Sequence, residues 1–242
     1  GNAIDFGNLT QQVSSFLGTA SSRTRGLRFG GYIIPGDTKA IDYITIPSTG
    51  HASNFGDVDE ADRYGNAGSD STRAVQMGGY NGGSHKNIIQ YVTISTTGDA
   101  QDFGDLTAAS SLSLNTCTSP TRIVMGGKQG PGNTIEYITT QTTGNSSDFG
   151  DLITNSNQNC GSNVSNATRG IFYPGGPNLT SIDYITISTL GNSINFGTAL
   201  STGSGKQTCA SPTRALAASG GYTNTIQYVQ INTTGNAVDF GD

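Results

Sequence analysis

A short alternation of apolar and polar residues recurs five times along the chain. Its copies read AIDYITI, IIQYVTI, TIEYITT, SIDYITI and TIQYVQI, with Tyr at positions 43, 91, 137, 184 and 228. Ile and Tyr alternate with Asp, Glu, Gln or Thr, which is the period-two pattern of a strand with one buried face. Each copy therefore predicts one β-strand.

Three further markers keep the same order and period as this strand. A Thr-Arg pair comes first, a Gly pair follows it, and a Phe-Gly pair comes after the strand. The Phe-Gly pairs start at Phe6, Phe55, Phe103, Phe149, Phe196 and Phe240, at intervals of 49, 48, 46, 47 and 44 residues. The chain thus holds five complete units, and the segment GNAIDFG from Gly1 returns as GNAVDFG from Gly235.

Each unit predicts four short strands. The first is polar and rich in small residues, the second follows the Arg, the third is the alternating strand, and the fourth ends in the Phe-Gly pair. Four strands in about 48 residues is the size of one propeller blade. Because a single blade cannot bury both of its faces, neighbouring blades must stack. We interpret Phe as core and its Gly as a turn.

The fold class expected is therefore all-β, a five-bladed β-propeller of four-stranded blades. We expect residues 1–242 to form a single domain. Its blades span approximately residues 8–56, 57–104, 105–150, 151–197 and 198–242, and residues 1–7 are an extra copy of the fourth-strand segment. We expect Ala237 to Phe240 to complete the fifth blade.

The composition agrees with short strands joined by tight turns. The chain has 35 Gly, no Trp, 33% hydrophobic residues and a formal net charge of −5. No run approaches the roughly 18 apolar residues of a membrane helix, and the acidic balance argues against nucleic acid as a partner. Cys117, Cys160 and Cys209 lack CxxC spacing, so we expect no disulfide framework, no metal site and no cofactor.

The order of the Arg, the Gly pair, the strand with Tyr and the aromatic residue resembles the kelch repeat. In kelch the Gly pair ends the second strand, the Tyr lies in the third, and a Trp anchors the fourth. Phe stands here where kelch has Trp, and the spacing from the Arg to the Gly pair is shorter. The resemblance implies kelch-like blades.

A second resemblance covers the whole chain. The wording TR…GGY…TIDYITISTTGNAxDFGDL is similar to repeat arrays in tail and other virion proteins of marine phages, notably phages of cyanobacteria. Residues 183–188 and 144–151 carry it almost letter for letter. This resemblance implies a structural or attachment role in a virion, with a secreted or cell-surface location as the alternative. It supplies no catalytic site.

Five arginines share one position in the five units, and they make up nearly half of the basic residues. They are Arg25, Arg73, Arg122, Arg169 and Arg214. They could form an anion-binding ring, because guanidinium groups match carboxylates, sulfates and phosphates. Alternatively each could pair with a carboxylate or carbonyl of its own or the adjacent blade, with Asp5, Asp102, Asp148 and Asp239 as candidate carboxylates. We favour the structural alternative.

The loops after the Gly pairs differ between units and would lie on one rim. Tyr32, Tyr80 and Tyr222 stand at their bases. A rim with Tyr, Asn, Asp and Gly suits weak sugar or protein binding. These tyrosines are therefore the candidate binding residues.

Other polar features have simpler interpretations. His51 and His85 occupy nonequivalent positions, and we interpret both as exposed loop residues. The stretch from Gly203 to Thr208 lacks the spacing of a phosphate loop and predicts a turn entering an inner strand. The acidic cluster Asp57, Asp59, Glu60 and Asp62 lacks the spacing of a calcium loop, so we interpret it as a solvated turn.

The function expected is a non-enzymatic virion or tail-associated propeller, structural or for host-surface attachment. Its partners would be other virion proteins or a host-surface protein or glycan, and a homo-oligomer is left open. The alternative is a lectin-like propeller with one sugar pocket in each blade. An enzyme would need paired carboxylates in one cleft, and no unit stands out with such a pair.

Overall fold

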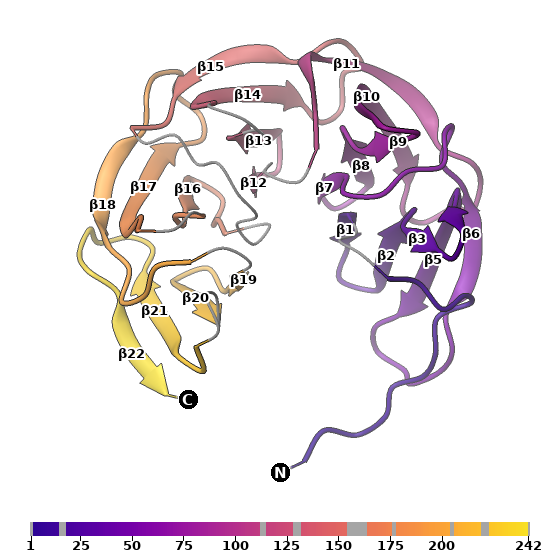
Figure 1. Ribbon diagram of the computed structural model, residues 1–242, viewed down its shortest axis with the longest axis horizontal. Coiled ribbons are helices and arrows are strands. Elements are labelled where there is room, and N and C mark those ends of the chain that lie inside the picture. The colour runs from indigo at the N-terminus through magenta and orange to yellow at the C-terminus, as the bar shows by residue number, and fades with distance from the viewer. Residues whose placement is uncertain are drawn as a thin grey trace. The chain divides into compact units, whose positions relative to one another are not determined.

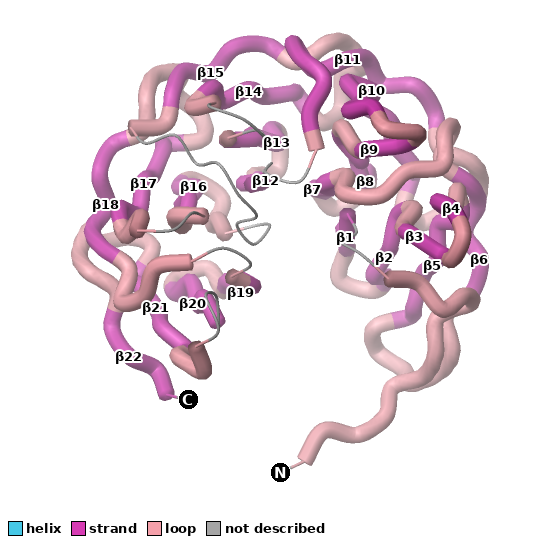
Figure 2. The backbone as a smooth tube through the Cα atoms, viewed as in Figure 1, coloured by secondary structure: helices cyan, strands magenta, loops and turns pink. Residues whose placement is uncertain are grey.

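Figure 1 shows the computed structural model of the chain, in which every regular element is a β-strand. The structure describes residues 2–14, 18–111, 115–127, 132–153, 164–175, 178–203, 206–218 and 223–241. Figure 2 shows only strands and loops along this part of the chain. Accordingly, the described residues include no helix that could cross a membrane.

Five antiparallel sheets follow one another along the sequence. Blade 1 has the order β1 (Gly18–Ser21), β2 (Arg25–Phe29), β5 (Ala40–Thr45), β6 (Ser53–Asp57), and blade 2 has β7 (Asn66–Ser69), β8 (Arg73–Met77), β10 (Ser84–Thr93), β11 (Gln101–Ser110). Blade 3 has β12 (Asn115–Thr118), β13 (Arg122–Gly126), β14 (Thr134–Thr139), β15 (Ser147–Asp151). Blade 4 has β16 (Arg169–Phe172), β17 (Ser181–Thr186), β18 (Ile194–Thr198), and blade 5 has β19 (Gln207–Ala210), β20 (Arg214–Ala218), β21 (Ile226–Gln230), β22 (Val238–Gly241).

The fold is that of a five-bladed β-propeller, as the repeats predict. Blade 4 has three strands among the described residues, because most of its predicted first strand, from Cys160 to Ser165, lies outside them. The variable loops are more ordered than the sequence predicts. They contain the short strands β3 (Tyr32–Ile33), β4 (Gly36–Asp37) and β9 (Tyr80–Asn81).

The chain divides into two compact units. Unit 1 comprises Gly1–Ala109 with Thr143–Asn145, and holds blades 1 and 2. Unit 2 comprises Ser110–Thr142 with Ser146–Asp242, and holds blades 3 to 5.

The core of each unit lies between neighbouring sheets. In unit 1, one cluster joins Leu27 and Phe55 of blade 1 to Ala67 and Val92 of blade 2. Because burial of apolar surface stabilises a fold by roughly 25 cal/mol per Å², each sheet depends on its neighbour. In the described part of unit 2, one such cluster joins blades 3 and 4 and another joins blades 4 and 5.

The Phe-Gly pair explains how closely neighbouring blades approach. Phe55, Phe103, Phe149 and Phe196 are each 2% exposed, which confirms the phenylalanines of these blades as core. The prediction that the Gly forms a turn is wrong, because it lies within the fourth strand. A Cβ on Gly56 would lie 2.2 Å from the carbonyl oxygen of Gly98 in the next blade. Only glycine allows this contact, and it recurs at Gly104, Gly150 and Gly197.

A repeated set of hydrogen bonds, here called the junction latch, joins each fourth strand to the next blade. Between blades 1 and 2, the amide of Gly98 donates to the carbonyl of Phe55, and that of Ala100 to the carbonyl of Asp57, each at 2.8 Å. The amide of Asp59 also donates to Oε1 of Gln90 at 2.8 Å. The same three amide bonds recur at two junctions of unit 2. Between blades 3 and 4, the amides of Gly191, Ser193 and Ile153 donate to the carbonyl of Phe149, the carbonyl of Asp151 and Oδ2 of Asp183. Between blades 4 and 5, the amides of Gly235, Ala237 and Leu200 donate to the carbonyl of Phe196, the carbonyl of Thr198 and Oε1 of Gln227.

The two copies of the GNAxDFG segment occupy different places. β22 pairs with β21 as the fourth strand of blade 5, the position predicted for Ala237 to Phe240. The first copy binds blade 1 through the junction latch. The amide of Gly50 donates to Phe6, and the hydroxyl of Thr10 donates to Oδ1 of Asp42 at 2.5 Å.

Candidate functional site

The five repeated arginines each stack on a tyrosine of the third strand. The centre of the Arg169 guanidinium lies 4.5 Å from the ring centroid of Tyr184, and this ring meets Phe196 edge-on at 5.8 Å. The other four blades repeat the arrangement. Their Arg–Tyr pairs are Arg25–Tyr43, Arg73–Tyr91, Arg122–Tyr137 and Arg214–Tyr228, at 4.4 to 4.7 Å.

The guanidinium donors of three of these arginines are used between blades. Nη1 of Arg25 donates to the carbonyl of Ile94 at 2.8 Å. Arg122 donates to Ile187 at 3.0 Å, and Arg169 to Ile231 at 2.9 Å, each in the following blade of unit 2. These contacts are those of the structural alternative, with carbonyl acceptors, because main-chain oxygens of the next blade accept the bonds.

A different arrangement of Arg and Tyr occurs at the loops of unit 1. The Arg63 guanidinium lies 4.7 Å from the ring centroid of Tyr32, 5.5 Å from that of Tyr64 and 5.4 Å from that of Tyr80. We call these four residues the rim cluster. All four side chains are partly exposed. The structure thus brings two of the predicted rim tyrosines together, whereas Tyr222 lies outside the described residues.

Local backbone bonds hold the rim cluster. Arg63 and Tyr80 exchange two backbone hydrogen bonds, at 3.2 and 2.8 Å, and the amide of Gly31 donates to the carbonyl of Asp62 at 2.7 Å. Tyr64 has φ of 63°, a left-handed conformation that is costly for a bulky residue and is often retained at functional sites. The segment before β7 is therefore fixed against the loops of both blades.

The polar groups of the rim cluster are incompletely paired. Nη1 of Arg63 lies 3.6 Å from Oδ1 of Asp37, which is an ion pair without hydrogen-bond geometry. The Asp37 side chain is only 8% exposed. Its Oδ1 and the Nε of Arg63 are both buried without a hydrogen-bond partner. Since buried polar groups normally find partners, two such atoms side by side set this cluster apart from the repeated Arg–Tyr pairs.

Asp62 lies buried beneath the rim cluster, so interpreting it as part of a solvated turn is wrong. Its Oδ2 accepts a hydrogen bond from Nε2 of Gln76 at 2.7 Å. Burial raises the pKa of Asp62 to about 7, and the Gln76 bond opposes the change. A Cβ on Gly79 would lie 2.3 Å from Oδ2 of Asp62, so a glycine of the repeated Gly pair leaves room for this carboxyl group. The described residues contain no metal-binding group of three or more candidate side chains.

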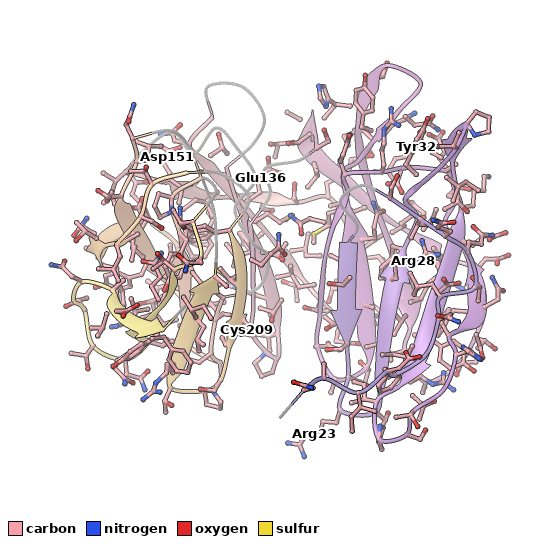
Figure 3. The ribbon with its side chains drawn as sticks, turned by 60° about the horizontal axis from the view of Figure 1, so that its bottom comes forward. Arg23, Arg28, Tyr32, Glu136, Asp151 and Cys209 are labelled. Atoms are coloured by element: carbon pink, nitrogen blue, oxygen red, sulfur yellow. The ribbon has the colours of Figure 1, made fainter. Side chains whose placement is uncertain are left out.

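The opposite end of unit 1 has a different character. Figure 3 shows Tyr32 and Arg23 at opposite ends of its strands, with Arg28 between them. Arg28 forms a buried ion pair with Asp42 at 2.8 Å. A shallow hollow of about 460 Å³ lies beside Arg23, and its lining is mostly small polar residues such as Ser22 and Asp70, together with Ile94. No aromatic residue lines it, so the rim cluster is the better candidate for binding.

Two histidine predictions have separate outcomes. His85 is exposed and meets the Tyr80 ring edge-on at 5.3 Å. His51 is exposed, but it is more than a free loop residue, because its Nδ1 accepts the amide of Asn8 at 3.0 Å. Asp99, Asn145, Asn192 and Asn236 accept the equivalent amide in the other junctions.

The stretch from Gly203 to Thr208, which lacks the spacing of a phosphate loop, contains Lys206. This lysine is buried and donates to the carbonyl of Gly203.

The sequence missed Arg63, Tyr64 and Asp37 as site residues. A signal was present, since Arg63 is a basic residue outside the repeated Thr-Arg position and directly precedes a Tyr. What the sequence did not contain was the pairing of β3 with β4, which places Asp37 opposite Tyr32. The folding of these loops therefore determines which residues make up the cluster.

The chain is a β-propeller, a fold that commonly serves as a binding or structural module. No protein-family model matches the chain, and no curated protein matches it.

Proposed function

We propose that the protein is a non-enzymatic attachment module that binds saccharide through the rim cluster of unit 1. The single observation that carries the proposal is the arrangement of Tyr32, Tyr64 and Tyr80 around Arg63, beside a buried carboxylate with an unpartnered oxygen. Tyrosine combines a flat apolar face with a polar tip, which suits the mixed surface of a sugar ring.

The polar atoms of the cluster match sugar hydroxyl groups. The Asp37 carboxylate would accept a bond from a hydroxyl, and the Arg63 guanidinium would donate to a ring or hydroxyl oxygen. A neutral saccharide fits better than an acidic one, because Asp37, Asp59, Glu60 and Asp62 place several carboxyl groups near this rim. Partial exposure of the tyrosines suits weak binding of a terminal sugar.

The resemblance of the repeats supports a proposed setting for this activity. The wording of the repeats resembles phage virion and tail arrays, and the order of markers resembles kelch blades. We therefore place the module in a virion tail, where saccharide binding would attach the particle to its host. The virion role is tested by immuno-electron microscopy of intact particles with a count of copies. Label on purified tails supports it, and label only in lysate proteins outside the particle contradicts it.

The binding role is tested with a glycan array of neutral and acidic saccharides, followed by calorimetric titration of the strongest binder. Tyr32→Ala and Arg63→Met should each weaken binding at least about tenfold, the equivalent of 1.4 kcal/mol. Arg23→Ala, at the other end of unit 1, is the control and should bind as the unchanged protein does. Recovery of the saccharide intact by mass spectrometry checks that no bond is cleaved. No binding to any array member, or equal losses for Arg23→Ala, would contradict the proposal.

A further inference from the structure

One buried carboxyl group next to the rim cluster belongs to a single unit of the repeat. Asp62 lies seven residues after the Phe of its Phe-Gly pair, where the other units have Val13, Ser110, Ser156 and Gly203. Its partner Gln76 lies three residues after the repeated Arg, where the other units have Arg28, Met125, Phe172 and Ala217. Because repeated positions build the scaffold of a repeat protein, a pair found in one unit points to a role other than architecture.

The carboxyl group of Asp62 occupies space that two glycines leave open, one from each blade of unit 1. A Cβ on Gly30 would lie 2.5 Å from Oδ1 of Asp62, and a Cβ on Gly79 would lie 2.3 Å from Oδ2. Asp62 is 5% exposed. Nε2 of Gln76 donates to its Oδ2, and Nε2 of Gln90 donates in turn to Oε1 of Gln76 at 2.8 Å. Main chain and side-chain amides therefore fix the place of this carboxyl group.

The basic groups near Asp62 are paired with other carboxyl groups. The charged side chains around it are Arg28 of β2, Asp37 of β4, Glu60 and Arg63 of its own segment, and Lys86 of β10. Nζ of Lys86 lies 2.7 Å from Oε2 of Glu60. Arg28 pairs with Asp42, and Arg63 forms its loose ion pair with Asp37. An ionised Asp62 would therefore have no ion-pair partner of its own in the described part of the chain.

Burial makes the ionised form of Asp62 costly. It raises the pKa of the carboxyl group to about 7, against the effect of the Gln76 hydrogen bond. The charges of Asp37 and Glu60 raise the pKa further, and that of Lys86 lowers it. The group is therefore protonated in mildly acidic solution and ionised in mildly alkaline solution. Ionisation in this setting favours a local opening that brings the side chain to water.

We propose that Asp62 is a positioning residue of the rim cluster, and that loss of its proton releases Arg63 and Tyr64 and so weakens binding. The inference rests on the proposed function, because saccharide is the ligand whose affinity would change. Arg63 and Tyr64 directly follow Asp62 in the chain, and the Asp62 carbonyl accepts the amide of Gly31, so a displaced Asp62 moves both residues. A saccharide on the cluster keeps water from the carboxyl group, so ligand and proton favour the same state.

A pH titration without saccharide tests the positioning role. In ¹⁵N NMR spectra of the unchanged protein, the Arg63 side-chain signal and the Tyr64 amide signal should shift with a midpoint near pH 7. In Asp62→Asn, the amide accepts the Gln76 bond and carries no charge. Its signals should therefore stay at their low-pH positions over the whole range.

Two controls exclude other groups that titrate. Asp102→Asn changes an exposed carboxyl group on β11 of the same unit, and it should keep the transition. The ring of His85 lies against Tyr80, and histidine changes charge near neutral pH. Every variant is therefore compared in a His85→Gln background, where the transition should persist.

Calorimetric titration with the strongest binder of the glycan array measures the effect on affinity. The unchanged protein should bind nearly equally at about pH 5 and pH 6, and about tenfold more weakly at about pH 8.5. Asp62→Asn should keep the low-pH affinity throughout. A flat profile for the unchanged protein, or the same fall in Asp62→Asn, would overturn the inference. If no saccharide binds, the proposed function fails and the NMR titration decides alone: a transition that Asp62→Asn abolishes supports the positioning role, and its absence overturns it.

Discussion

Arg169 and Arg63 both stack on tyrosine rings, but their hydrogen-bonding surroundings differ. Arg169 stacks on Tyr184 at 4.5 Å and donates to a main-chain carbonyl of the next blade at 2.9 Å. Arg63 stacks among three tyrosines, yet its Nε is buried without a partner and its nearest carboxylate lies 3.6 Å away. Arg169 thus has a hydrogen-bond acceptor in the next blade, whereas Nε of Arg63 has no partner.

This difference separates architecture from recognition. The Arg–Tyr stacking recurs in five blades. The bonds of Arg25, Arg122 and Arg169 to carbonyl groups of the next blade stabilise the junctions. A partly paired arrangement in a loop region has unused hydrogen-bonding capacity, which a ligand can take up.

Gly150→Ala should have the largest effect on stability. The new Cβ would lie 2.5 Å from the backbone of Gly191, and φ of Gly150 is 144°. Because both contacting groups are main chain, the blades must separate, at a cost on the order of 4 kcal/mol or the loss of folding. Urea unfolding measures it. Gly36→Ala, where nothing lies within 4 Å of the added Cβ, is the control and should change stability little. Equal stability of both variants would argue against close blade contact at the Phe-Gly pair.

Arg169→Ala should cost about 2 kcal/mol of unfolding free energy. It removes a charge-assisted hydrogen bond and the stacking on Tyr184, and it leaves the Ile231 carbonyl without this donor. Thermal unfolding should show a lower Tm. A change within experimental error would mean that the repeated arginines do not stabilise the junctions, and the anion-binding alternative would regain support.

Asp62 links the pH dependence of stability to the rim. Its pKa is about 7 in the folded protein and near 3.8 when exposed. Between these values the folded state holds a proton that the unfolded state releases, so unfolding free energy should fall as pH rises from about 4 to about 7. The fall is at most about 4 kcal/mol, since one pKa unit is worth about 1.4 kcal/mol. Urea unfolding across this range should be flatter for Asp62→Asn, and identical slopes would contradict the assignment.

Arg63→Ala should have the smallest effect on stability, below about 1 kcal/mol. Its cation–π contacts are partly exposed and its ion pair with Asp37 is loose. Thermal unfolding measures the change, with Arg169→Ala as the matched comparison. A loss as large as that of Arg169→Ala would show that the rim cluster is chiefly a structural joint.

The sequence was enough to predict the blades because each carries its own signals. Tyr184 lies in a strand with period-two alternation, and Phe196 directly precedes a glycine that the next blade approaches closely. Both signals can be found within a few residues of sequence. The rim cluster could not be predicted in full. Asp37 reaches it only because β3 and β4 form a hairpin, and Asp62 becomes buried only when glycines of two blades surround it. Within the described residues the hairpin is absent from most repeats, and the burial of Asp62 depends on contacts between two repeats, which no single repeat encodes.

The distinction between Arg169 and Arg63 is tested most directly by measuring saccharide affinity and Tm together for Arg63→Ala and Arg169→Ala. The account predicts that Arg63→Ala loses binding and keeps its Tm within a few degrees, while Arg169→Ala keeps binding and loses Tm. If Arg169→Ala abolishes binding with an unchanged Tm, or Arg63→Ala unfolds the protein and leaves binding intact, the account is contradicted.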